Sequence, residues 1–184
     1  MPRIADVNLS DRILDAAYEI VKKQGAEAVT LRAVAIRAKT TTPTVYARFE
    51  TREELLMALA NRLRLRFAAE MMRQPTLQKA AESYLRQAIE HPHDYHLIYE
   101  IGWPRIFQNE ADQPGVTWTR ERMAELHGGK PKDYVSVVEC LWMELHGGAA
   151  FISKAPKSPI AKRFFKTCLR ACELIPENAP LFRQ

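Results

Sequence analysis

The stretch between residues 29 and 56 constrains the fold of this 184-residue chain more than any other part. Apolar residues recur there at helical spacing in two short runs, with a break at Lys39. Thr30 and Thr41 each stand just before a run, where a hydroxyl can cap a helix start. Thr51 begins a capping-box pattern. The stretch therefore predicts two short helices joined by a tight turn and followed by a third helix.

The second of these helices carries small polar side chains on one face and apolar ones on the other. Val45 and Phe49 are four residues apart and face inward, whereas Thr42, Thr44 and Arg48 point outward. A short exposed helix of this kind, on a compact apolar support, suits insertion into the major groove of DNA. The pattern predicts a helix-turn-helix.

The same residues resemble the N-terminal domain of TetR-type (TetR/AcrR) transcriptional regulators. That family has a threonine–aliphatic–tyrosine core, a phenylalanine, a basic residue and a Glu-Glu-Leu-Leu helix start. Lys39 stands where the family usually has a turn glycine, at a cost of about 1 kcal/mol in a left-handed conformation, so we expect a slightly altered turn. The matching positions here are Thr44, Val45, Tyr46, Phe49, Arg52 and residues 53–56.

The resemblance implies an all-α fold, which scarce glycine and the lack of period-2 β-branched runs also favour. We expect a three-helix DNA-binding domain in residues 1–50, a linking helix in 51–73, and a helical ligand-binding and dimerisation domain in 74–184. The implied function is a ligand-responsive transcriptional regulator, most often a repressor. It would bind a palindromic operator as a homodimer and leave it when a small, largely apolar effector binds.

Carrying the family's roles over assigns DNA contacts to the recognition helix and the neighbouring helix starts. Thr42 and Pro43 should meet base edges or a thymine methyl group, and other members of the set should hold phosphates. Tyr46 could instead be a half-buried packing residue. The expected DNA-binding residues are Thr30, Arg32, Thr41, Thr42, Pro43, Thr44, Tyr46, Arg48 and Arg52.

A second, shorter resemblance lies at residues 141–147, which are similar to the Trp-x-x-x-His-Gly signature of a ligand domain in some TetR-type regulators. Gly147 and Gly148 in mid-helix cost about 1 kcal/mol each relative to alanine, which implies close helix approach or a kink beside a cavity. The last two helices, of which the final one is expected at 160–174 with a tail from Pro176, would pair with their copies in a dimer. The alternative is that they form the domain's own core.

Aromatic and soft side chains of the second domain could line a pocket for an apolar ligand with a few polar anchors. Taken one by one, the same residues are better explained as plain core, because aromatic residues at helical spacing are more often core than pocket. The expected ligand-binding residues are Tyr99, Trp103, Phe107, Trp118, Trp142, Met143 and His146.

The formal net charge of +5 suits a polyanionic partner, and the excess lies in residues 1–73, with 13 Lys and Arg against 9 Asp and Glu. Arg62, Arg64 and Arg66 are interpreted as a solvated surface. No signal peptide, transit peptide or apolar run of about 18 residues is recognised, so a cytoplasmic protein without membrane association is expected.

Cysteine and histidine offer weaker alternatives. Cys168 and Cys172 could belong to a metal or redox site but fit small buried hydrophobes better, and the histidines at 91, 93 and 96 fit a polar helix start better than a metal site. We expect no metal, no cofactor and no enzymatic activity. The rival functions are a helical adaptor or architectural protein and, less favoured, a hydrolase or lyase using His127, His146 or Cys140.

Overall fold

The computed structural model describes residues 8–102 and 113–182, and within these ranges every regular element is a helix, which confirms the predicted all-α fold. Short 3-10 turns (η1, η4, η5) and a π-helical turn (η2) connect the longer helices. In chain order the elements are α1 (Leu9–Gln24), η1 (Ala26–Ala28), α2 (Leu31–Arg37), α3 (Thr42–Tyr46), α4 (Arg52–Met72), α5 (Leu77–Glu90), α6 (Pro92–His96), η2 (Leu97–Ile101), α8 (Pro114–His127), η4 (Pro131–Tyr134), α9 (Val135–Lys154), α10 (Pro159–Glu177) and η5 (Ala179–Phe182).

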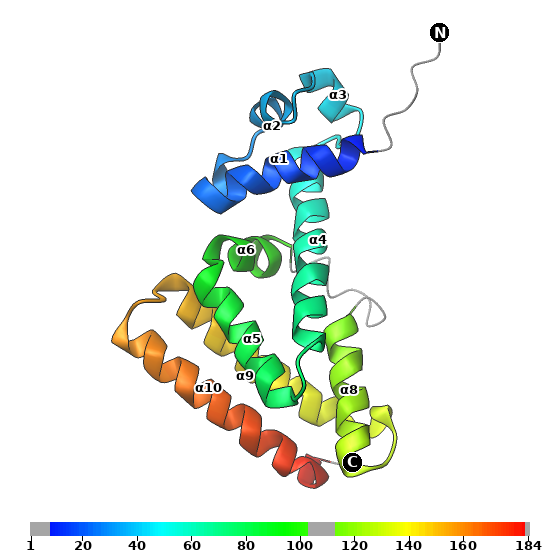
Figure 1. The fold of residues 1–184 in the computed structure, drawn as a ribbon, viewed down its shortest axis with the longest axis vertical. Coiled ribbons are helices and arrows are strands. Elements are labelled where there is room, and N and C mark those ends of the chain that lie inside the picture. Colours follow the sequence, from blue (N-terminus) through cyan, green and yellow to red (C-terminus); the bar gives the residue numbers. More distant parts are fainter. Residues whose placement is uncertain (1–7, 103–112, 183–184) are drawn as a thin grey trace.

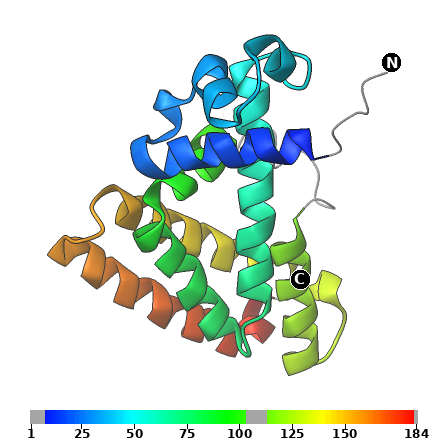
Figure 2. The same ribbon diagram turned by 45° about the horizontal axis from the view of Figure 1, so that its top comes forward.

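Helix α4 is the long central helix that joins the two ends of the molecule (Figure 1). Its N-terminal half carries α1, α2 and α3 at one end, and its C-terminal half lies among α5, α6 and α8 at the other. Figure 2 shows α1 crossing in front of α4 rather than running alongside it. Helix α4 therefore extends from the helix-turn-helix into the second half of the fold.

Local capping explains where α4 begins. The Thr51 hydroxyl accepts a hydrogen bond from the Glu54 N–H at 3.0 Å, as the sequence pattern predicts. The Glu54 carboxylate reaches one residue further back than a standard capping box and accepts from the Glu50 N–H at 2.7 Å. Helix α1 begins at Leu9, with Asn8 at the N-cap position and no side-chain cap.

The N-terminal core joins residues from both halves of the chain. Buried side chains of α1, α2, α3 and α4 pack around Leu59 and Leu63, and Leu97 and Ile98 of η2 pack into the same cluster. These two side chains are fully buried. The division at residue 73 remains a prediction, and the packing shows that the segment after α6 is also part of the support for the DNA-binding end.

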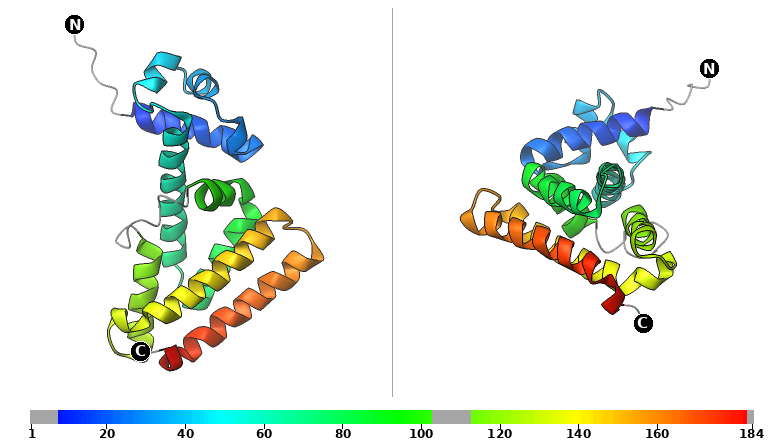
Figure 3. Two further views of the ribbon diagram at one scale, coloured as in Figure 1. Left: turned by 180° about the vertical axis from the view of Figure 1, so that it is seen from behind. Right: turned by 60° about the horizontal axis from the view of Figure 1, so that its bottom comes forward.

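Helices α9 and α10 form an antiparallel pair that covers α5 on the far side of the molecule from α1 (Figure 3). Gly148 of α9 makes this pairing close, since a Cβ added there would overlap the Cys168 sulfur of α10. Gly147 has open space around it. Of the two expectations for the glycine pair, close helix approach holds at Gly148.

Two expectations at the C-terminal end are corrected. Pro176 does not begin a tail: it lies buried in the last turn of α10, and residues 179–182 continue as a 3-10 turn.

The expectation that no long apolar run is present is also corrected. The segment Pro131–Lys154 is apolar and long enough to cross a membrane by length and composition alone. The core helix of a soluble protein meets the same criterion, and α9 packs against α5 and α10.

Candidate nucleic-acid interface and ligand cavity

The turn between α2 and α3 is held by the two predicted threonine caps. Thr30 Oγ1 accepts a hydrogen bond from the Ala33 N–H at 3.1 Å, and Thr41 Oγ1 accepts from the Thr44 N–H at 3.3 Å. Lys39 has a φ of +53°, in the left-handed region. The lysine therefore adopts the conformation that glycine takes most easily, and it bears the steric cost of its Cβ there.

Helix α3 is anchored from one side and open on the other. Val45 is fully buried, and Phe49 is buried just beyond the helix end with its N–H donating to the Val45 carbonyl at 2.9 Å. Tyr46 is 52% exposed and Arg48 is exposed. The predicted contact residues at the helix start, Thr41, Thr42, Pro43 and Thr44, are exposed or partly exposed, as is Arg32 on α2.

Arg52 differs from the other predicted DNA contacts because its guanidinium is already engaged within the protein. Its Nε donates to the Val29 carbonyl at 2.8 Å, and its Nη2 donates to the Ala26 carbonyl at 2.9 Å. Glu27 and Glu53 lie within 3.7 Å of it. These bonds tie the connection between α1 and α2 to the start of α4, so Arg52 has a structural role beside the predicted phosphate contact.

Sequence reasoning left out two cations at this end. Arg37 and Lys39 are both exposed, and Lys39 stands on the turn that leads into α3. Ile36, the residue before Arg37, is 72% exposed. The positive charge of Arg37 and Lys39 is the sequence signal that marks them.

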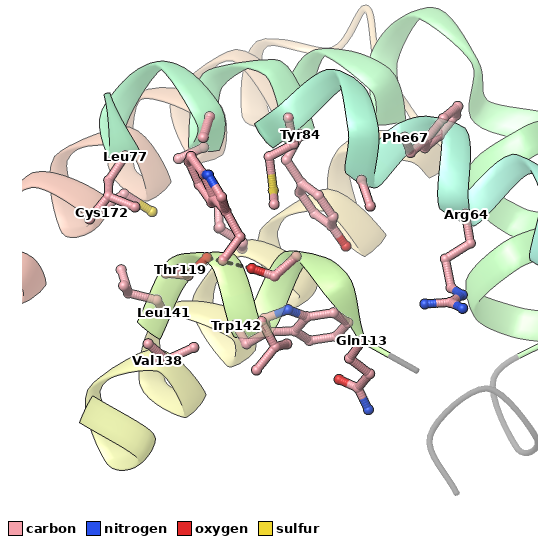
Figure 4. Close-up of a pocket in the computed structure, with 18 of the residues that line it drawn as sticks. Arg64, Phe67, Leu77, Tyr84, Gln113, Thr119, Val138, Leu141, Trp142 and Cys172 are labelled. Atoms are coloured by element: carbon pink, nitrogen blue, oxygen red, sulfur yellow. Dashed lines mark hydrogen bonds between the residues drawn. The ribbon is translucent and has the colours of Figure 1, made fainter. Parts of the chain in front are cut away.

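A cavity of about 80 Å³ lies between the C-terminal half of α4 and helices α5, α8, α9 and α10. Three predicted ligand residues, Tyr99, Trp118 and Trp142, line it. Tyr84 and Trp142 lie on opposite walls (Figure 4). Arg64 and Gln113 lie at one end, and Leu77 and Cys172 lie at the other. The cavity is therefore polar at one end and apolar at the opposite end.

The other predicted ligand residues lie elsewhere. Met143 is 67% exposed on α9 and does not line the cavity. His146 is not part of the lining, but its ring stacks on Trp142 with centroids 5.4 Å apart. Trp103 and Phe107 lie outside the described residues. The helical periodicity of α9 explains why Met143 does not line the cavity. Successive residues of a helix are about 100° apart, so Met143 points outward where its neighbour Trp142 points toward the interior.

A hydrogen-bonded aromatic cluster stands behind this wall. Tyr84 Oη and Tyr95 Oη lie 3.2 and 3.0 Å from His146 Nδ1, and the Tyr95 hydroxyl also donates to the His146 carbonyl at 3.1 Å. Burial lowers the pKa of His146, and burial raises the pKa of Tyr99 to about 12. The neutral imidazole can accept a hydrogen bond from a tyrosine hydroxyl at Nδ1, so this arrangement holds the His146 side chain in place while the ring is uncharged.

Arg64, Tyr84 and Thr119 line the cavity but were missed by sequence reasoning. The interpretation of the three arginines of α4 as a solvated surface is wrong at Arg64, whereas the side chain of Arg66 is 48% exposed. Arg64 is partly buried at the cavity, and Arg66 pairs at 3.2 Å with Asp94, whose side chain is 2% exposed. The surroundings of these arginines depend on how α5, α6 and α8 pack around α4. No signal in the local sequence predicts that packing.

The cysteines of α10 behave as small buried hydrophobes in this structure. Burial raises the pKa of Cys168 to about 11 and that of Cys172 to about 12, which keeps both thiols protonated at neutral pH. His91 and His93 are exposed, and His96 pairs with Glu100 at 3.0 Å. Among the described residues no three histidine, cysteine or acidic side chains form a group suited to a metal ion.

The fold and the exposed α3 define a helix-turn-helix domain joined by one long helix to a helical domain with an internal cavity. Residues 13–59 match the family described as "Bacterial regulatory proteins, tetR family". The N-terminal part of this chain, from α1 to the first turns of α4, is therefore similar to that family.

The chain is also similar to an HTH-type nicotine-responsive transcriptional repressor, HdnoR, of Paenarthrobacter nicotinovorans, with 33% identity over 61 residues. That match spans 33% of this chain and 31% of the repressor.

Solved structures match nearly the whole chain and share its fold. A TetR variant from Acinetobacter baumannii in complex with minocycline has a TM-score of 0.70 and 15% identity, covering 95% of this chain and 97% of that one. A TetR transcriptional regulator from Rhodococcus sp. RHA1 has a TM-score of 0.61 and 18% identity, covering 92% and 95%. At these identities the likeness concerns the fold, and it extends the TetR-like architecture beyond the N-terminal domain.

Proposed function

We propose that this protein is a cytoplasmic, ligand-responsive transcriptional repressor without enzymatic activity, which binds a palindromic operator as a homodimer. The observation that carries the proposal is that one helix serves both ends of the molecule. Leu55, Leu56 and Leu59 of α4 share one apolar core with Val45 of α3, and the C-terminal half of α4, through Met71, lines the cavity. A ligand that repacks the cavity therefore acts on the same rigid element that orients α3.

DNA contacts in this proposal divide between α3 and the surrounding helix starts. Thr42 and Pro43 at the tip of α3 contact base edges, while Thr30, Thr41, Thr44 and Tyr46 contact phosphates. Arg32 and Arg48 contact a base or a phosphate, and a bidentate arginine–guanine pair gives about 1–3 kcal/mol of discrimination. The bonds of Arg52 to the Val29 and Ala26 carbonyls leave a further phosphate contact to its remaining guanidinium donors.

Dimerisation in this proposal uses the outer faces of α9 and α10. Met143 and Phe151 are eight residues apart on α9 and are 67% and 65% exposed, and Ile160 of α10 is 56% exposed. Phe151 stacks on Phe164 with ring centroids 5.2 Å apart, which extends the apolar surface across both helices. A second copy of the chain is the occupant we propose, because a two-fold dimer presents two recognition helices to a palindrome.

Release in this proposal is a shift between two conformations. Effector binding favours a conformation whose recognition helices are wrongly spaced for the operator. A differential affinity of about 1–3 kcal/mol between the two conformations is typical of such coupling.

The experiment that tests the proposal is a gel mobility shift with the DNA that flanks the gene. The wild type is compared with Tyr46→Ala and with Arg73→Ala, which removes an exposed side chain at the far end of α4. Specific binding that weakens in Tyr46→Ala and persists in Arg73→Ala supports the proposal. Equal binding by all three proteins would show that α3 is not the reading element. If flanking DNA is not bound, selection from genomic fragments decides whether any operator exists.

A further inference from the structure

The cavity lining is rich in hydrogen-bond donors at one end. Arg64 carries a guanidinium there, and Gln113 offers an amide next to it (Figure 4). Tyr84, Tyr99 and Trp142 also line the cavity, and the Tyr84 hydroxyl lies 3.2 Å from His146 Nδ1. Arginine is the one charged residue among the described lining residues. A ligand that presents an anionic acceptor at this end therefore meets a permanent cation.

Arg64 is held at the cavity rather than extended into solvent. It is partly buried, and its Nη2 donates to the Asn61 side-chain oxygen at 2.9 Å, one turn earlier on α4. Its charge opposes the effect of burial on the pKa of Tyr99, which places the guanidinium within electrostatic reach of that hydroxyl. The lining thus places a positive charge beside the aromatic wall, and the effect on the pKa of Tyr99 agrees with that position.

The remaining lining favours a flat ring. Phe67, Tyr84, Tyr99, Trp118 and Trp142 surround the space, and the end opposite Arg64 is closed by Leu77 and Cys172. At about 10–15 Å³ for each water molecule, a cavity of about 80 Å³ has room for several waters, and a single substituted ring enters it when the lining side chains move apart. Aromatic walls of this kind offer stacking and edge-to-face contacts to such a ring.

We propose that the effector is a small aromatic carboxylate, with its ring in the apolar part of the cavity and its carboxylate paired with Arg64. This inference rests on the proposed function and specifies its ligand class. The anchoring residue stands on α4, the helix that carries the DNA-binding end, so the ionic contact forms on the element whose position sets the spacing of the recognition helices.

The test is isothermal titration of the full-length protein at neutral pH and constant ionic strength with three probes of matched size. Benzoate carries the charge, benzamide is its neutral counterpart, and benzylamine carries the opposite charge. The proteins are the wild type, Arg64→Gln and Arg62→Gln. Arg62 is the matched control, since it lies on the same helix, does not line the cavity and pairs with Asp15 at 2.7 Å.

The expected result is that the wild type binds benzoate about tenfold or more tightly than benzamide, as a charge-assisted bond predicts, and binds benzylamine least. Arg64→Gln loses this preference while retaining benzamide binding, and Arg62→Gln keeps it. Equal binding of benzoate and benzamide would overturn the inference and leave an apolar effector in the proposed function. Failure of all probes to bind would overturn it as well, while the gel shift judges operator binding separately.

Discussion

The hydroxyl of Tyr18 in α1 donates a hydrogen bond of 2.9 Å to Oδ2 of Asp94 in α6. The Arg66 guanidinium of α4 donates to the same carboxylate oxygen at 3.2 Å and to the Tyr18 hydroxyl at 2.9 Å. Asp94 is 1% exposed. Helices α1, α4 and α6 thus meet at one buried carboxylate. Helix α1 belongs to the end that carries the helix-turn-helix, α6 to the second half of the chain, and α4 joins the two.

We predict that this contact stabilises the junction measurably. Asp94→Asn should lower the free energy of unfolding by about 1–3 kcal/mol because it removes a charged acceptor, and Tyr18→Phe should lower it by about 0.5–1.5 kcal/mol. A double-mutant cycle by urea denaturation should give a coupling energy of about 0.5–3 kcal/mol. Strict additivity of the two changes would show that the hydrogen bond contributes nothing to the junction.

The glycine pair of α9 offers a matched test of helix packing. Gly148→Ala should destabilise the protein by about 1–3 kcal/mol, since the added methyl group overlaps the Cys168 sulfur and forces α9 and α10 apart. Gly147→Ala has open space and should raise stability by up to about 1 kcal/mol through helix propensity. Thermal and urea denaturation of the two variants measure the difference. Equal effects would contradict the close approach at Gly148.

The left-handed turn predicts a stabilising substitution. Lys39→Gly should raise the free energy of unfolding by about 0.5–1 kcal/mol, because glycine adopts a positive φ without the steric cost of a Cβ. Lys39→Ala is the control, as it removes the same charge and retains the Cβ. A gain in both variants would attribute the effect to charge instead of backbone conformation.

Stability should depend on pH through His146. Burial holds its pKa below the ordinary value of 6.5, so the unfolded chain binds the proton more readily. Stability therefore rises with pH through the window below 6.5 and is lost as the pH falls from there toward the lowered pKa. The stability difference between the wild type and His146→Gln should shrink on acidification, as urea denaturation at neutral and acidic pH can measure. A constant difference would mean that His146 titrates alike in both states.

The sequence predicted the elements that depend on local chemistry. Thr30, Thr41 and Thr51 cap the helices expected of them, because a cap needs only residues three positions away. The roles of Arg52 and Arg66 could not be predicted, since their partners lie 23 or more residues away in the sequence. The role of Arg64 depends on how α5, α8 and α9 pack around α4. Only some of the cavity residues were predicted. The periodicity of the aromatic residues indicates which helix face points inward, but it does not indicate which inward-facing residues line a cavity.

The most direct test of the account is the salt dependence of operator binding. For the wild type, the logarithm of the binding constant should fall steeply and linearly with the logarithm of the salt concentration, as release of counterions from phosphates requires. Arg48→Ala should weaken binding. Where Arg48 contacts a phosphate, the variant should also reduce the slope by about 2, one contact in each of two subunits. Binding with no salt dependence, and with the same affinity in the variant, would contradict a dimer that holds DNA through α3.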